Sequence, residues 1–166
     1  LIIDGTGSEA FRGDIGVIDG KIARVGLDKD KTWHADVEID GTDSIVCPGF
    51  IDTHTHDDFL LLFEGGAMTP KISQGVTSVV VGNCGISLSP LKLSEGVPLA
   101  EPLPLLASRD QFLYGTVAEY VAACNKIGPN TNYKILTGHS TLREQSMASL
   151  KAVNTRAANT QELDDM

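Results

Sequence analysis

Three short apolar runs, each rich in β-branched residues, constrain the fold of this chain more than any other feature. They cover residues 45–51, 76–81 and 133–136 and carry few charges, as strands buried on both faces do. Stretches with helical periodicity separate them, and the clearest, 117–127, places its apolar side chains on one face. Because strands that alternate with helices pair in parallel, the pattern predicts an α/β fold.

Further helices are predicted over 68–74 and 141–153, and Asn159 with Glu162 forms a capping box that opens a last helix. The segment 87–106 differs because prolines are spread along it. We expect no regular element there, and such segments are commonly lids, binding loops or interfaces.

The N-terminal region has a different pattern of short strands and tight turns. Residues 14–18 and 21–25 flank Asp19-Gly20, which is the strongest local signal for a two-residue hairpin turn. Residues 37–40 alternate between apolar and polar side chains and predict another strand.

These patterns divide the chain into two parts. We expect residues 1–44 to form the N-terminal part of a small β-sandwich and 45–166 to form the first three βα units of a (β/α)8 barrel. A doubly wound sheet is the alternative, but the chain lacks the glycine fingerprint of dinucleotide-binding folds. Since a barrel needs eight units, the chain is expected to be the N-terminal portion of a longer enzyme.

Composition excludes several classes of partner. The formal net charge of −9 argues against nucleic acid and anionic membrane surfaces, which bind basic patches, and no apolar run is long enough to span a bilayer. Cys47, Cys84 and Cys124 do not form a disulfide framework, which favours a reducing cytoplasm. Cys47, on a predicted strand, and Cys124, on a predicted helix, are expected to be buried.

The candidate metal ligands follow the first two predicted strands. His54 and His56 come directly after the first strand, where residues two apart project to the same side. Cys84 follows the second strand between glycines, either as a zinc ligand, since a thiolate binds zinc strongly, or as a buried, inert thiol. Asp57 and Asp58 come next to the histidines, either as acceptors that orient an imidazole or as solvated carboxylates.

His139 and Arg143 follow the third predicted strand and are candidates for binding substrate. His139 could also ligate a metal, polarise a carbonyl or hydrogen-bond its neighbours. Arg143 could bind a carboxylate, and an exposed surface position accounts for it equally well.

At these residues the chain resembles the amidohydrolase superfamily, whose mark is His-x-His after the first barrel strand. The segment 48–56 (PGFIDTHTH) fits that signature. The segments 71–87 (KISQGVTSVVVGNCGIS) and 138–143 (GHSTLR) narrow the resemblance to the N-acyl-D-amino-acid deacylases, or D-aminoacylases. The similarity covers nearly the whole chain, and its most specific part is Gly-Asn-Cys-Gly.

The resemblance implies a distorted (β/α)8 barrel of the TIM type with a small β-sandwich built from both ends of the chain. It implies zinc-dependent hydrolysis of N-acyl-D-amino acids to a carboxylate and a free D-amino acid, through metal-activated water. His54, His56 and Cys84 map to zinc ligands, with Cys84 where many relatives use a carboxylated lysine. The remaining histidine ligands and the catalytic aspartate of the family lie on later strands, so the general base is expected beyond Met166 and this chain alone is expected to be inactive.

Two other functions are compatible with these residues. A cyclic-amide hydrolase of the dihydroorotase or hydantoinase type shares His-x-His, but Cys84 in Gly-Asn-Cys-Gly argues against it. A non-catalytic binding or oligomerisation module accounts for the missing downstream ligands, whereas the intact motifs argue against it for the parent protein.

Overall fold

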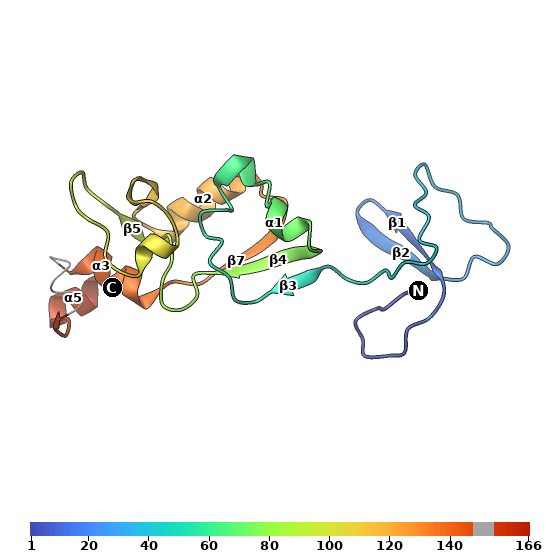
Figure 1. The fold of residues 1–166 in the computed structure, drawn as a ribbon, viewed down its shortest axis with the longest axis horizontal. Coiled ribbons are helices and arrows are strands. Elements are labelled where there is room, and N and C mark those ends of the chain that lie inside the picture. Colours follow the sequence, from blue (N-terminus) through green and yellow to red (C-terminus); the bar gives the residue numbers. More distant parts are fainter. Residues whose placement is uncertain (148–154) are drawn as a thin grey trace. The chain divides into compact units, whose positions relative to one another are not determined.

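A computed structural model describes residues 1–147 and 155–166 and divides the chain into two compact units, Leu1–Pro48 and Gly49–Met166. Figure 1 shows the elements of both units. The division falls after Pro48, later than the predicted boundary at Ser44. Among the described residues, no helix is long and apolar enough to cross a membrane.

The first unit is built around a β-hairpin, as predicted. Strand β1 (Asp14–Ile18) pairs with β2 (Lys21–Gly26) in antiparallel register. The turn residues Asp19 and Gly20 have φ of 51° and 72°, as a type I′ turn requires. The strand predicted at 37–40 is wrong, because these residues form no strand and Ile39 is 89% exposed.

The first predicted strand of the α/β region, 45–51, is correct only in its last two residues. Residues Phe50–Asp52 form β3, whereas Val46 belongs to the first unit and forms an isolated parallel bridge with Ile2. The apolar run is therefore shared between two units. Cys47 is exposed and lies outside any strand, so its predicted burial is also wrong.

The second unit contains a three-stranded parallel sheet of order β3-β4-β7. Strand β4 (Val76–Val81) is central, and β7 (Asn132–Ile135) lies at one edge. On the other edge, Phe50 and Ile51 of β3 are 58% and 65% exposed. The parallel α/β arrangement agrees with the sequence pattern (Figure 1).

Helices connect these strands and cover the sheet. The short α1 (Thr69–Ile72) leads into β4, and α2 (Val117–Ile127) has the predicted bounds. Thr116 caps α2 by accepting from the Glu119 N–H, and Gly128 ends it at φ 68°. The other elements of the unit are η1 (Phe63–Gly66), β5 (Leu91–Lys92), η2 (Leu103–Leu105), η3 (Arg109–Gln111), β6 (Leu113–Tyr114), α3 (His139–Ser146) and α5 (Thr160–Asp165).

Two predicted helices after β7 have a mixed outcome. Helix α3 begins at His139, two residues before the predicted start at Thr141, and the part predicted over 148–153 lies outside the described residues. Asn159 caps α5 by accepting from the Glu162 N–H, as the capping box predicts.

The proline-containing segment 87–106 is a packed part of the second unit. It includes β5 and η2, so the expectation that it has no regular element is wrong. Its Leu88, Leu91 and Leu103 are at most 1% exposed and join the same apolar core as Val79 of β4 and Tyr120 of α2. Apolar burial therefore holds this segment in the core of the second unit.

Candidate metal centre

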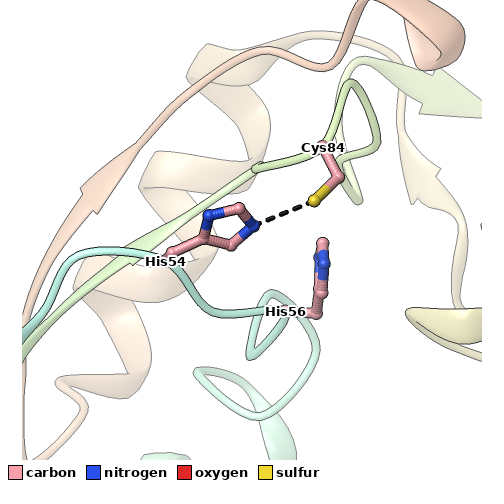
Figure 2. Close-up of side chains that lie close together, drawn as sticks. All are labelled: His54, His56 and Cys84. Carbon is pink, nitrogen blue, oxygen red and sulfur yellow. Dashed lines mark hydrogen bonds between the residues drawn. The ribbon is translucent and has the colours of Figure 1, made fainter.

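Two neighbouring loops bring three candidate ligands together. His54 and His56 lie in the loop after β3, and Cys84 lies in the turn after β4. Because β3 and β4 are parallel neighbours, the loops after them leave the same edge of the sheet. Figure 2 shows the three side chains pointing toward one another, with His54 Nε2 2.9 Å from Cys84 Sγ and the two imidazole centroids 5.9 Å apart.

The arrangement fits a metal ion of zinc's size and preferences. The ligand atoms of the three residues all lie within 4.8 Å of one another. A tetrahedral zinc, with bonds of about 2.0–2.3 Å, holds its ligand atoms roughly 3.3–3.8 Å apart. The distances among the three ligand atoms thus bracket the spacing around a zinc ion, and all three residues are exposed, so an ion can enter.

The turn that carries Cys84 has an unusual backbone. Cys84 has φ of 55° between Gly82 at 81° and Gly85 at 76°. A non-glycine residue in this left-handed region costs about 1 kcal/mol or more, and such strained residues cluster at functional sites. At Gly82 an added Cβ would lie 2.0 Å from the Leu136 carbonyl oxygen, so the turn packs directly against the end of β7.

Lys71 of α1 holds the segment that carries the two histidines. Its Nζ lies 2.7 Å from Asp52 Oδ2, 2.9 Å from Asp57 Oδ2 and 3.1 Å from Thr55 Oγ1. The hydrogen bond from Lys71 lowers the pKa of Asp52. Burial acts to lower the pKa of Lys71, but its bonds to Asp52 and Asp57 outweigh burial and raise the pKa. The Lys71 ammonium group thus forms ion pairs with carboxylates on both sides of His54 and His56.

Asp58 joins the two ligand-bearing loops from inside the protein. It is fully buried, and its carboxylate accepts from the Leu88 N–H at 3.0 Å and the Gly82 N–H at 3.3 Å. Burial raises its pKa, and these two N–H groups oppose that rise. Its main-chain oxygen accepts from the Tyr120 hydroxyl. Asp58 is therefore not a solvated carboxylate, and its described bonds go to main chain rather than to an imidazole.

The two residues predicted to bind substrate occupy different environments. His139 is exposed at the start of α3, where the neighbouring Ser140 N–H donates to the Gly85 carbonyl at 2.8 Å. Arg143 is half-buried and donates from Nη2 to the Arg156 carbonyl at 3.0 Å. The group of close candidate ligands in the described residues does not include His139.

Sequence reasoning missed the residues that hold the ligands in place. Lys71 and Asn83 lie within the segment 71–87, but the sequence pattern predicts no role for them and does not predict the burial of Asp58. The contacts from Lys71 to Thr55, from Asn83 to Thr55 and from Leu88 to Asp58 span 16, 28 and 30 residues of the chain, so periodicity and spacing carry no signal for them. The one available signal was Asn83 itself, since a short amide between a strand and a glycine-rich turn commonly bonds to nearby main chain.

Comparison with known proteins gives a consistent set of relatives. The chain is 43% identical over 165 residues to the D-aminoacylase of Alcaligenes xylosoxydans xylosoxydans, covering 99% of this chain and 32% of that protein. It is 42% identical over 146 residues to the N-acyl-D-glutamate deacylase of the same organism, covering 88% of this chain and 28% of the relative. No family model matches the chain.

Solved structures agree with these relatives. A D-aminoacylase studied for its binuclear metal centre matches with a TM-score of 0.85 and 41% identity, covering 99% of this chain and 32% of that one. The N-acyl-D-glutamate deacylase of Bordetella bronchiseptica, in complex with zinc and a phosphonate inhibitor, matches with a TM-score of 0.84 and 38% identity over the same shares.

The chain thus spans about a third of the length of the curated relatives it matches, and nearly all of it is matched. The 165 aligned residues take in nearly all of both units. The chain therefore belongs to the D-aminoacylase family of N-acyl-D-amino-acid deacylases, which are amidohydrolases.

Proposed function

We propose that the protein hydrolyses the amide bond of N-acyl-D-amino acids, and that this chain supplies part of its zinc site through His54, His56 and Cys84. The observation that carries the proposal is the convergence of two imidazoles and a thiol at one edge of the parallel sheet (Figure 2). Relatives named for the deacylation of D-amino-acid derivatives support the substrate class.

The donor set favours zinc over harder metals. Imidazole and thiolate are ligands for zinc, whereas magnesium and calcium take oxygen ligands. The nearby carboxylates of Asp52 and Asp57 are paired with Lys71, which keeps them out of competition for the ion. When bound, zinc would lower the pKa of a water molecule and polarise the scissile carbonyl.

The rest of the site is proposed to come from later parts of the protein. Three protein ligands leave a tetrahedral ion with an open position, and the general base is expected beyond Met166. We extend the proposal to His139 as a substrate-binding group, since it is exposed on the helix whose start bonds to Gly85. Arg143 is proposed in the same role, for which its guanidinium would have to exchange its bond to the Arg156 carbonyl.

The fold is proposed to continue in the same manner. Strands β3, β4 and β7, with their helices, are the first three βα units of a (β/α)8 barrel, and the first unit is part of a small β-sandwich. The open edges of the three-stranded sheet and the exposed apolar residues of β3 support this extension. The free cysteines are consistent with a cytoplasmic location, which we also propose.

The proposal is tested with the full-length protein and matched cysteine variants. Zinc content after dialysis and hydrolysis of N-acetyl-D-amino acids, their L-enantiomers and a hydantoin are measured for the natural protein, for Cys84→Ala and for Cys47→Ala. Cys47 is also an exposed free cysteine but lies in the first unit, so its variant controls for the loss of an exposed thiol.

We expect hydrolysis of the D-enantiomers only, loss of activity on chelation and its recovery on addition of zinc. Cys84→Ala should lower both zinc content and turnover, whereas Cys47→Ala should preserve both. Full zinc content in Cys84→Ala would overturn the proposed ligand set, and a preference for the hydantoin would overturn the proposed substrate class.

A further inference from the structure

The amide side chain of Asn83 connects the two loops that carry the candidate ligands. Its Nδ2 donates to the Val80 carbonyl at 2.7 Å and to the Thr55 carbonyl at 3.3 Å. Asn83 precedes Cys84 in the chain, and Thr55 lies between His54 and His56. The half-buried Asn83 side chain therefore connects the loop that carries the two imidazoles to the turn that carries the thiol.

Both main-chain groups of Thr55, the carbonyl and the N–H, are hydrogen-bonded to residues near the end of β4. While the Thr55 carbonyl accepts from Asn83, the Thr55 N–H donates to the Val80 carbonyl at 3.2 Å. The Val80 carbonyl thus accepts from both Thr55 and Asn83. This three-residue network fixes the main chain between the two histidines against the C-terminal end of strand β4.

The chemistry of the contact requires an amide. Both partners of the Asn83 side chain are carbonyl oxygens, which only accept, so the group facing them must supply two donors from one position. The Nδ2 of asparagine does this, whereas a carboxylate of the same shape would place an oxygen against two oxygens. A shorter side chain would not span the gap.

We propose that Asn83 is a positioning residue of the metal site, which sets the distance between the Cys84 thiol and the imidazoles of His54 and His56. The inference rests on the proposed zinc site, and it assigns a role to a residue that does not itself ligate. Residues that orient ligands in this way typically contribute a factor of about 10 to 100 to metal affinity.

Asn132 provides a matched control on the same sheet. Its Nδ2 also donates to main-chain carbonyl oxygen, that of Thr77 at 3.2 Å, near the opposite end of β4. Truncating Asn132 removes the same kind of bond without touching the ligand-bearing loops. Asn83→Ala and Asn132→Ala therefore separate metal positioning from general loss of stability.

The experiment uses the full-length protein loaded with Co²⁺ in place of zinc. Cobalt affinity is measured by competition with a chelator, and the thiolate-to-cobalt charge-transfer band is recorded at equal metal occupancy. Circular dichroism and urea unfolding of the metal-free proteins verify that each variant is folded. We expect Asn83→Ala to weaken cobalt affinity by about 10- to 100-fold and to diminish the charge-transfer band, while Asn132→Ala leaves both unchanged.

The outcomes distinguish this inference from the proposed site itself. If the natural protein lacks the thiolate band, or if Cys84→Ala retains it, the zinc-site proposal fails. If the natural protein has the band and Cys84→Ala loses it, but folded Asn83→Ala keeps natural affinity and band intensity, the positioning role of Asn83 is refuted. Equal loss of affinity in Asn83→Ala and Asn132→Ala would refute it as well.

Discussion

Replacing Gly82 with alanine should disrupt the turn that carries Cys84, because two separate costs fall on this position. The backbone has φ of 81°, and an L-residue in the left-handed region costs about 1–2 kcal/mol. The added Cβ would also lie 2.0 Å from the Leu136 oxygen and 2.7 Å from its carbonyl carbon. These are main-chain atoms, so β7 and the turn must move apart.

The second cost can be estimated from the contacts that must give way. Forcing an extra methyl group into a packed region costs about 1–3 kcal/mol. The Leu136 N–H donates to the Val81 carbonyl at 2.9 Å, and weakening this neighbouring bond adds about 0.5–1.5 kcal/mol. The expected total for Gly82→Ala is therefore about 2.5–6.5 kcal/mol, the sum of backbone strain, overlap and the weakened bond.

Gly128→Ala is the matched control for backbone strain alone. Gly128 has φ of 68° at the end of α2, and an added Cβ there meets nothing within 4 Å. Its expected cost is about 1–2 kcal/mol. Urea unfolding of the full-length protein and both variants gives the comparison, and we expect Gly82→Ala to be less stable than Gly128→Ala by about 1.5–4.5 kcal/mol. Equal unfolding free energies would refute the assigned close approach to β7.

Three further predictions concern other contacts of the second unit. Thr116→Ala removes the side-chain cap of α2 and should lower the unfolding free energy by about 0.5–2 kcal/mol in urea; no change would contradict the capping role. Asp58→Ala leaves two buried N–H groups without their acceptor and should cost about 2 kcal/mol or more in the same assay. The hydrogen bond from Arg156 lowers the pKa of Glu162 to about 2, so its stabilising contribution is complete above the ordinary value of 4.5 and is lost as the pH falls through the folded value. Carbon NMR of the Glu162 carboxyl should report this pKa and show a rise toward 4.5 in Arg156→Gln; an unshifted titration in that variant would exclude the ion pair as the cause.

Local signals predicted the elements whose determinants lie close together in the chain. The hairpin of β1 and β2 follows from Asp19-Gly20, which adopts the positive φ values of its turn. Helix α2 has the predicted bounds because Thr116 caps its start and Gly128 ends it. In each case the residues that decide the structure are neighbours in the sequence.

Predictions failed where tertiary contacts decided the outcome. Residues 45–51 form one apolar run, but Val46 pairs with Ile2 in the first unit, and β3 begins only at Phe50. In the segment 87–106, prolines favour irregular backbone, yet buried leucines such as Leu91 hold short regular elements against the core. Neither the pairing partner nor the burial is visible in the run itself.

The sequence predicts that the candidate ligands converge, but it does not predict the contacts that hold their loops in place. His54, His56 and Cys84 follow successive strands, and parallel pairing alone is enough to bring them to one edge. Asp58 and Lys71 act through partners on other elements, so their contacts depend on how the loops fold. The candidate ligands were therefore easier to infer than the side chains that hold their loops in place.

The left-handed backbone of Cys84 has a consequence for how this site changes among homologues. On conformational grounds alone, glycine and asparagine suit the position better than cysteine, so a thiol here carries a local backbone cost. A homologue that has abandoned metal chemistry should drift to one of those two residues here while keeping the shape of the turn. The amino acid at this position in each homologue should then distinguish members that bind a metal ion from members that have lost the metal site.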